Sequence, residues 1–370
     1  MLSDSADRAA SDAPVAIRLV RVEVPLVVAH RSSHGTARVR DVVLVEWQRS
    51  DGTSGWGECP TVDQPGYSTE STDAAWRGLR DDLVPAALAG RTPRWGGLVA
   101  AAGSLADARL DAALRADGRS LVAELGADDR RLERCVVIAD LGAAPDELAR
   151  RAVDAVAGGA VLVKLKIAPG ADVEPLRSVI AAVGADRVAA DANGAYRSIE
   201  ELGAVDDLGL VYLEQPVAAG ATWDELATLT RALRTPVALD ESLTSPDAVR
   251  DALNAGAADV VSVKPARLGG VRAAALAVEL AAAAGVDAFV GGMLELGVGR
   301  ATSAAVAALP GCTLPTDLGP SDRYVDADVT EPVVVDTDGR LVVPTGPGCG
   351  RTPLADVLSR CTVDEVLLRA

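Results

Sequence analysis

The sequence predicts an α/β barrel preceded by a small α+β unit, and two observations lead to this prediction. From about Cys135 onward, short apolar runs typical of strands alternate with Ala- and Leu-rich stretches of helical spacing. Charged residues end five of these runs at intervals of 25, 23, 26 and 24 residues, and they are Lys166, Asp191, Glu214, Asp240 and Lys264. A repeat of this length matches one strand–helix unit, and seven or eight such units close into a barrel.

The first third of the chain has the pattern of the α+β unit. Residues 1–14 are polar and acidic, so we expect a disordered tail. Strands are expected at residues 16–26, 42–48 and 54–59, with a hairpin turn at Asp51-Gly52 between the last two. Helical spacing of apolar residues then dominates over residues 72–125.

The remaining two thirds supply the barrel. The expected strands are CVVIADL, VLVKLKI, RVAADAN, GLVYLEQP, PVALDES, VVSVKP and DAFVGG. An open doubly wound sheet is the alternative, but no Gly-x-Gly-x-x-Gly follows a first strand. After Pro310 the regularity fades into a hairpin around Asp338-Gly339 and a last helix–strand pair. We therefore expect an α+β unit at 15–130, a barrel at 131–320 and a C-terminal segment at 321–370 that packs back on the first unit.

Composition argues against several classes of protein. The 370 residues include 36 Lys and Arg against 53 Asp and Glu, a net charge of −17, and only 3% aromatic residues, which disfavours nucleic-acid binding. Five scattered cysteines without a Cys-x-x-Cys pair fit reduced thiols in the cytoplasm. An uncharged apolar run of about 18 residues is absent, so we expect no membrane span.

Histidine is nearly absent from the sequence. The two histidines are His30 and His34, so chemistry in the C-terminal part must proceed without imidazole. Its base would be a carboxylate, lysine, tyrosine or thiolate.

Three carboxylates end successive expected strands. Taken singly, Asp191, Glu214 or Asp240 could cap a helix or pair with an arginine. Side by side at a barrel mouth they would repel one another, and a divalent cation would relieve that repulsion. Oxygen ligands without His or Cys favour Mg²⁺ or Mn²⁺.

Three lysines complete the predicted mouth. Lys164 and Lys166 are two residues apart on one strand, so they point to the same side, which is the interior of a closed barrel. Lys264 ends a later strand, so Lys166 and Lys264 are expected to flank the carboxylates. Nearby positive charge from a metal, Lys164 or Arg267 would lower a lysine pKa enough for it to act as a base. A metal between two such bases suits proton abstraction next to a carboxylate.

Several motifs resemble a known family. The runs VKLKI, DANGAY, EQP, LDES and VKPARLGG together resemble the enolase superfamily in its muconate-lactonizing subgroup. GWGEC followed by Tyr67, GGMLELGVGRA, SDRY, DVTEP and LVVPTGPGCG resemble the branch that contains o-succinylbenzoate synthases and N-succinylamino acid racemases. The resemblance covers nearly the whole chain from about residue 16. It implies a modified (β/α)7β TIM barrel with an N-terminal α+β capping domain.

The resemblance also implies roles for individual residues. Asp191, Glu214 and Asp240 would bind Mg²⁺, for which Mn²⁺ could substitute, and Lys166 and Lys264 would be the acid/base catalysts. The residues expected to bind substrate or support the site are Lys164, Asn193, Arg267, Gly291, Gly292, Leu294, Tyr67 and Tyr324. Both tyrosines could equally be packing residues.

The activity implied first is that of a Mg²⁺-dependent o-succinylbenzoate synthase, a lyase of menaquinone biosynthesis. Lys166 would remove the proton α to the substrate carboxylate, and the β-hydroxyl would leave an enediolate intermediate as water. The alternative is racemisation of N-succinylamino or other N-acylamino acids by the same two lysines. The expected partners are a small-molecule carboxylate and further copies of this chain as a homo-oligomer, with neither nucleic acid nor membrane.

The sequence departs from the family pattern at two places, and two other classes of protein remain as alternatives. Ile138 stands where this branch has a small polar residue, and residues 315–320 lack the Asp-x-Asp of dipeptide epimerases. Lys264 would also suit a Schiff-base aldolase, which would tolerate EDTA and be trapped by borohydride. A non-catalytic binding protein is disfavoured, because five charged groups at one mouth are costly without a function.

Overall fold

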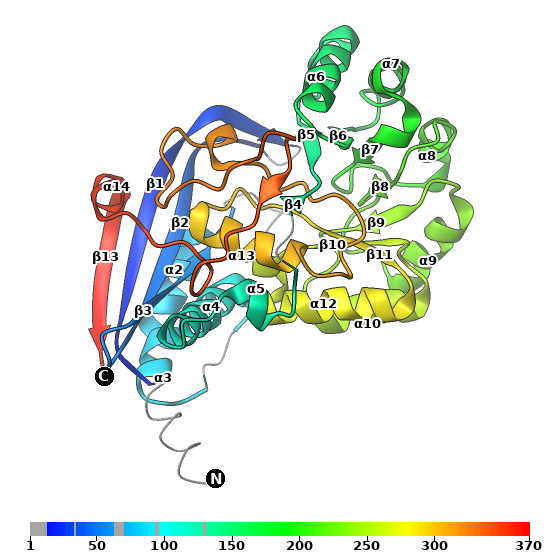
Figure 1. Ribbon diagram of the computed structural model, residues 1–370. Helices are drawn as coiled ribbons and strands as arrows, with labels where there is room; N and C mark the ends of the chain where they lie inside the picture. Colours follow the sequence, from blue (N-terminus) through cyan, green and yellow to red (C-terminus); the bar gives the residue numbers. More distant parts are fainter. Residues whose placement is uncertain (1–12, 33–34, 63–69, 93–95, 129–130) are drawn as a thin grey trace.

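The computed structural model describes residues 13–32, 35–62, 70–92, 96–128 and 131–370, and two main sheets organise it (Figure 1). The first is antiparallel, with strand order β13-β1-β2-β3. Its members are β1 (Pro14–Ser32), β2 (Gly35–Arg49), β3 (Ser54–Cys59) and β13 (Thr362–Arg369). The predicted hairpin between β2 and β3 is confirmed, with Gly52 at φ +85° in its turn. β1 extends beyond the expected strand at both ends, because β2 pairs with it as far as Ser32.

The apolar residues of β1 alternate between the two faces of this N-terminal sheet, and both sets are buried. Ile17 and Leu19 of β1 pack with the helices that follow β3. Val20, Val22 and Val24 point the other way and belong to the same core cluster as the barrel. The sheet therefore lies between its own helices and the barrel.

The helical stretch expected over residues 72–125 is divided in the structure. It contains α2 (Thr72–Gly78), a π-helical turn (Leu79–Leu83), α3 (Val84–Leu88), α4 (Val99–Ala116) and α5 (Leu121–Glu124). Gly90, Gly96 and Gly97 have positive φ between α3 and α4, a conformation that ends a helix. α4 packs so closely on β3 that a Cβ at Gly57 would lie 2.0 Å from the Ser104 carbonyl oxygen.

The second sheet is parallel and runs in chain order from β5 to β11. Its strands are β5 (Cys135–Ile138), β6 (Leu162–Lys166), β7 (Val188–Asp191), β8 (Leu213–Glu214), β9 (Val237–Leu239), β10 (Val260–Val263) and β11 (Asp287–Val290). The eighth position is filled by residues 313–316. Leu314 N–H donates to Ala288 at 3.1 Å on one side, and Cys135 N–H donates to Thr316 at 2.7 Å on the other. This closure is the predicted modified (β/α)7β barrel.

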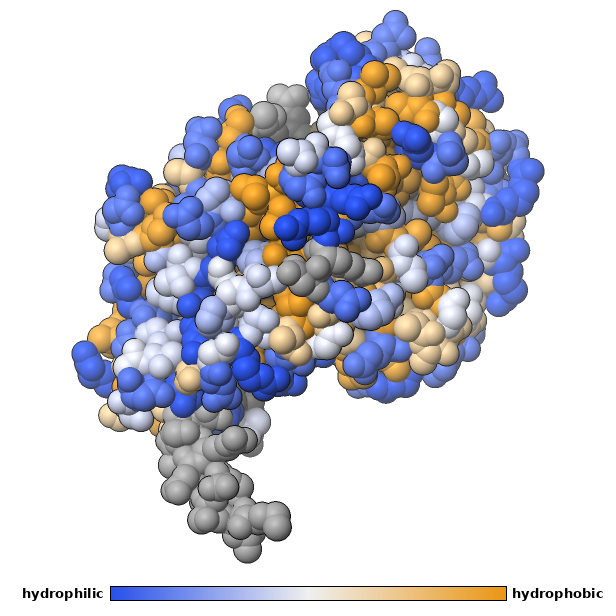
Figure 2. Space-filling model, in the orientation of Figure 1, coloured by the Kyte–Doolittle hydropathy of each residue, from blue (hydrophilic) through white to orange (hydrophobic). Residues whose placement is uncertain are grey.

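Helices cover the outside of the barrel (Figure 1). They are α6 (Pro145–Ala157), α7 (Val173–Val183), α8 (Ile199–Asp206), α9 (Trp223–Ala232), α10 (Pro246–Ala255), α12 (Val271–Ala284) and α13 (Gly297–Ala307), whereas the short α11 (Pro265–Leu268) follows β10 at the mouth and contacts α4. Local signals mark their ends: Ser245 caps α10 before Pro246, and Gly285 ends α12 in the left-handed region. Figure 2 shows hydrophilic side chains along the outer rim of these helices. Within the described ranges, none of the helices combines the length and apolarity that spanning a membrane requires.

The interior of the barrel is built in layers. One layer near the start of the strands consists of Cys135, Leu162, Ala189, Tyr212, Ala238, Val260 and Phe289. The side-chain period of two then places Lys164 above this layer, with its Nζ 5.0 Å from the centre of the Phe289 ring. One step further, the same period brings Lys166 and Asp191 to the mouth.

The C-terminal part returns to the N-terminal sheet. β12 (Leu341–Val342) pairs with β4 (Arg131–Leu132) beside the barrel, and α14 (Ala355–Cys361) leads into β13. β13 is antiparallel to β1, with Ala16 opposite Arg369. The end of the chain therefore supplies one edge strand of the first sheet.

Candidate active site

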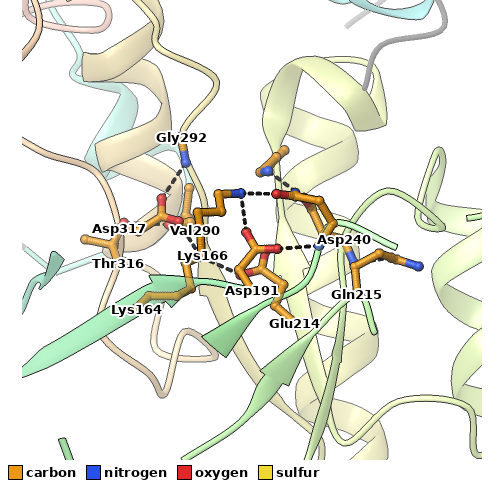
Figure 3. A network of polar contacts seen from close by, with 12 residues as sticks. Lys164, Lys166, Asp191, Glu214, Gln215, Asp240, Val290, Gly292, Thr316 and Asp317 are labelled. Atoms are coloured by element: carbon orange, nitrogen blue, oxygen red, sulfur yellow. Dashed lines mark hydrogen bonds and ion pairs between the residues drawn. The ribbon is translucent and has the colours of Figure 1, made fainter. Parts of the chain in front are cut away.

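Charged side chains from neighbouring strands meet at the carboxyl ends of the barrel strands (Figure 3). Asp191, Glu214 and Asp240 end or directly follow β7, β8 and β9, and all three are buried. Lys166 ends β6 and Lys264 follows β10, so the strand order places the two lysines on either side of the three acidic strands. The structure therefore brings together the five charged residues that the sequence predicts.

Lys164 is the buried centre of one side of the mouth. Its Nζ lies 2.5 Å from Oε2 of Glu214 and 2.6 Å from Oδ2 of Asp317, which follows the closing segment of the barrel. Burial lowers the pKa of Lys164, but Asp317 and Glu214 more than offset it and hold the pKa well above its ordinary value. Lys164 is therefore a fixed cation that compensates two carboxylates.

Lys166 is held at the entrance to the same group. Its Nζ lies 2.6 Å from Oδ2 of Asp191 and 2.5 Å from Oδ1 of Asn193. Asn193 in turn donates through Nδ2 to Glu241 at 2.9 Å, and its backbone N–H donates to Asp191. Two acceptors thus fix the direction of the Lys166 ammonium group.

Asp240 connects the cations of the opposite flank. Its Oδ2 lies 2.6 Å from Nζ of Lys264, and its Oδ1 accepts a hydrogen bond from Arg267. Burial raises the pKa of Asp240, but the charges of Arg267 and Lys264 outweigh burial and hold the pKa well below its usual range. Asp240 is therefore ionised and binds both cations at once.

Backbone geometry beyond the strand ends directs these side chains. Asn193 and Gln215 have φ of +43° and +38°, in the left-handed region that residues with a Cβ rarely adopt. Hydrogen bonds of the Gln215 side chain stabilise its left-handed backbone conformation, because its Oε1 accepts from the backbone N–H groups of Asp240 and Ser242 at 3.1 and 3.2 Å. Such conformations persist only where neighbouring contacts hold them.

The remaining predicted residues occupy different places. A Cβ at Gly291 would lie 2.9 Å from Cε of Lys264, so a larger residue at this point of the mouth would have to displace the lysine side chain. Gly292 N–H donates to Oδ1 of Asp317 at 2.7 Å, and Leu294 has φ +57°. Tyr324 stacks against Arg300, whose guanidinium carbon lies 4.6 Å from the ring centre. Tyr67 lies outside the described residues.

Ile138 differs from the expectation that it stands in the site. It pairs with Leu165, while its neighbour Val137 pairs with the inward-pointing Lys164. Because side chains alternate along a strand, Ile138 points away from the barrel interior and into the outer hydrophobic core. The residue type at position 138 therefore says little about the shape of the mouth.

The carboxylates form an all-oxygen donor set that fits a hard divalent cation. Oε1 of Glu214 is buried and accepts no hydrogen bond from the described residues. Burial raises the pKa of Glu214 to about 7, and the charges of Asp191 and Asp240 act in the same direction. No three acidic, Cys or His side chains of the described residues form a ready-made metal cage, since each of the three carboxylates binds a lysine instead.

Three residues of the network were missed by the sequence reasoning. Asp317 follows the eighth strand position, which the strand pattern itself could have marked as part of the mouth. Glu241 directly follows Asp240, and Gln215 directly follows Glu214. Their adjacency to predicted ligands was visible, but the hydrogen bonds that give them their roles depend on the backbone conformation.

A barrel with acidic ligand candidates between two lysines defines a class of (β/α)-barrel enzymes, and comparison with known proteins identifies the family. Residues 147–357 match the family described as Enolase C-terminal domain-like, and the chain belongs to the enolase superfamily.

Individual relatives agree with this assignment. The chain is 40% identical to an N-succinylamino acid racemase of an Amycolatopsis species, over 95% of this chain and 98% of the relative. It is 35% identical to an o-succinylbenzoate synthase of Geobacillus kaustophilus, over 90% of this chain and 91% of the relative. A solved structure of a probable mandelate racemase from Alicyclobacillus acidocaldarius is similar with a TM-score of 0.86 and 35% identity, covering 96% and 98% of the two chains.

Proposed function

We propose that this chain is a Mg²⁺-dependent enzyme that removes a proton α to a carboxylate, and that its principal reaction is the dehydration that forms o-succinylbenzoate. The placement of Lys166 and Lys264 on opposite flanks of Asp191, Glu214 and Asp240 carries this proposal. Relatives with the names o-succinylbenzoate synthase and N-succinylamino acid racemase support the two reactions considered.

Asp191, Glu214 and Asp240 would hold the metal. The orphaned, buried Oε1 of Glu214 and the all-oxygen donor set support this assignment. When bound, Mg²⁺ would supply positive charge that stabilises the enediolate formed by loss of the α-proton. Lysines that now neutralise the carboxylates would be released for acid/base work.

Lys166 would act as the base and then as the acid of the dehydration. Its neutral amine takes the α-proton, and the resulting ammonium gives a proton to the β-hydroxyl, which leaves as water while the carbon–carbon double bond forms. Lys264 would remain an ammonium ion and stabilise negative charge on the substrate. The greater exposure of the Lys166 side chain, 14% against 6% for Lys264, supports this division of roles.

Racemisation of N-succinylamino acids is the second candidate, and the position of Lys264 favours it. A 1,1-proton transfer needs one group on each side of the α-carbon, which two flanking lysines provide. The same site would then serve both reactions. Lys264 would act as a base in racemisation and as a stabilising ammonium ion in dehydration.

The test uses the purified full-length protein with Mg²⁺ and three kinds of assay. We expect dehydration of the β-hydroxy carboxylate precursor of o-succinylbenzoate, exchange of the α-proton of N-succinylamino acids in deuterated water, and loss of both in excess EDTA. Activity that survives EDTA and is trapped by borohydride would instead indicate a Schiff-base aldolase.

A further inference from the structure

The loop of residues 291–296, between β11 and α13, lies at the mouth and is fixed at its start by the barrel. Gly291 lies against Lys264, and Gly292 N–H donates to Asp317 at 2.7 Å. One end of the loop is therefore anchored to the charged residues of the mouth. Its other end is held by a different part of the molecule.

Arg40 of β2, in the N-terminal sheet, binds the middle of this loop. Its Nε donates to the Leu294 carbonyl at 2.8 Å, and its Nη2 donates to the Met293 carbonyl at 3.2 Å. The third arm of the guanidinium, Nη1, donates to the Thr61 carbonyl at 2.6 Å within the N-terminal unit. Arg40 is 4% exposed, and the fork it forms holds Leu294 in its left-handed conformation.

Glu58 of β3 binds the end of the loop. Its Oε1 accepts from Leu296 N–H at 2.7 Å, and its Oε2 accepts from Gly299 N–H at 2.8 Å. These N–H groups belong to the start of α13, where a helix leaves its donors without partners. A Cβ at residue 299 would lie 3.1 Å from Cδ of Glu58, so glycine permits this close approach.

We propose that Arg40 and Glu58 are positioning residues that hold the 291–296 loop in a fixed position relative to the N-terminal sheet. The position of the loop in turn determines which substrate side chains fit beside Lys264. This inference rests on the proposed proton-transfer function. The contacts that carry it join residues more than 230 positions apart, and they end on backbone atoms of the loop and of the start of α13.

The first test measures selectivity with N-succinyl derivatives of alanine, valine and phenylalanine. Glu58→Gln keeps one acceptor but loses the second, and Arg40→Lys keeps the positive charge but loses the planar fork whose three nitrogens bind three carbonyl groups. We expect each variant to change the ratio of kcat/KM between the phenylalanine and alanine substrates by about tenfold, since small misplacements have large kinetic effects. An equal loss of kcat/KM for all three substrates in both variants would overturn the proposal.

Glu70→Gln provides the matched control. Glu70 is also buried and also accepts two backbone N–H groups at a helix start, those of Ala100 and Ala101 at 2.5 and 3.2 Å. That helix lies within the N-terminal unit, so this variant should change stability but leave the substrate ratio within about twofold of the wild type.

The second test does not depend on activity. Hydrogen–deuterium exchange of peptides covering residues 291–300 should be at least about tenfold faster in Glu58→Gln and Arg40→Lys than in Glu70→Gln. If the wild type turns over none of the three substrates, the proposed racemisation is wrong. The exchange measurement still tests whether Arg40 and Glu58 fix the 291–296 loop. Unchanged exchange of residues 291–300 in both variants would overturn the positioning role itself.

Discussion

Lys264 and Asp240 form a buried ion pair in which Nζ and Oδ2 are 2.6 Å apart, and the second oxygen of Asp240 binds Arg267. One carboxylate thus organises two cations and, in the proposed function, also contributes to a metal site. Replacing either cation or the carboxylate should therefore have different and separable consequences.

Asp240→Asn should leave the fold intact and lower both proposed activities by at least about two orders of magnitude, because it removes an anionic ligand of a divalent ion. Circular dichroism checks the fold, and calorimetric titration with Mg²⁺ checks the affinity for the metal. Full activity and unchanged Mg²⁺ binding in this variant would contradict the proposed metal site.

Arg267→Ala should reduce α-proton exchange of N-succinylamino acids more than it reduces dehydration. The positive charge of Arg267 disfavours the ammonium form of nearby Lys264, which must be neutral to act as a base but charged to stabilise an anion. Rates of the two reactions in one preparation give the comparison. Arg267→Lys is the control that keeps the charge, and equal losses in both reactions for Arg267→Ala would count against this role.

The two lysines should be distinguishable in deuterated water. If they face opposite sides of the α-carbon, Lys166→Ala should abolish exchange initiated from one enantiomer of an N-succinylamino acid, and Lys264→Ala should abolish it from the other. Proton NMR of each enantiomer measures the exchange rate.

Dehydration provides the internal comparison for the same two variants. Lys166→Ala should abolish it, because that residue would serve as both base and acid, whereas Lys264→Ala should weaken it by loss of a stabilising charge. Wild-type exchange of both enantiomers in both variants would mean that the lysines do not act on opposite faces.

Much of this fold is readable from the sequence because its elements are locally determined. α10 begins at a Ser-Pro pair, and α10 and α12 both end at a glycine, so residues of the chain itself mark these bounds. The five charged strand ends could be found because a parallel barrel converts a regular spacing into a common mouth. The same regular spacing identifies the lysines on both sides of the three carboxylates.

The contacts that shape the site are not local, and this explains what the sequence did not reveal. Asp317 lies 153 residues from its partner Lys164, and although the strand pattern could place both near the mouth, it does not show that they form an ion pair. The resemblance alone places Ile138 in the mouth, and the pairing of Ile138 with Leu165 turns its side chain to the opposite face of β5. Arg40 and Glu58 act on backbone atoms, which no pattern of residue types records.

The carboxyl group of Asp107, a half-buried residue of α4, should make stability depend on pH. Burial raises its pKa to about 7, from about 3.8 for the ordinary group, although Val271 N–H donates to it. Between these pH values the folded state binds more protons than the unfolded state, so this residue's contribution to stability falls as the pH rises from about 4 to 7.

Asp107→Asn removes that titration and keeps an oxygen that can accept from Val271. The free energy of unfolding of the variant, relative to the wild type, should therefore increase from pH 5 to pH 8 in urea titrations. Asp224→Asn, at an exposed position of α9, is the control and should show a constant difference. A constant difference for Asp107→Asn as well would refute the assigned effect of burial.

Two glycines should respond to alanine in opposite directions. Gly57→Ala forces a Cβ to within 2.0 Å of the Ser104 carbonyl oxygen, and we expect a loss of about 1–3 kcal/mol from overpacking. Gly203, inside α8, has no atom within 4 Å of the corresponding position, so Gly203→Ala should gain about 0.5–1 kcal/mol in helix stability. Thermal or urea unfolding measures both, and destabilisation by Gly203→Ala would contradict the open surroundings.

The pairing of β13 with β1 has a consequence for how the protein is made. Ala16 is synthesised before the barrel, but its partner Arg369 is synthesised only after the barrel. During translation, β1 therefore presents an unpaired edge while the entire barrel is being produced, a state open to pairing with other nascent chains. Synthesis of the segment that follows the barrel, rather than emergence of the first strands, is then the event that completes the N-terminal sheet.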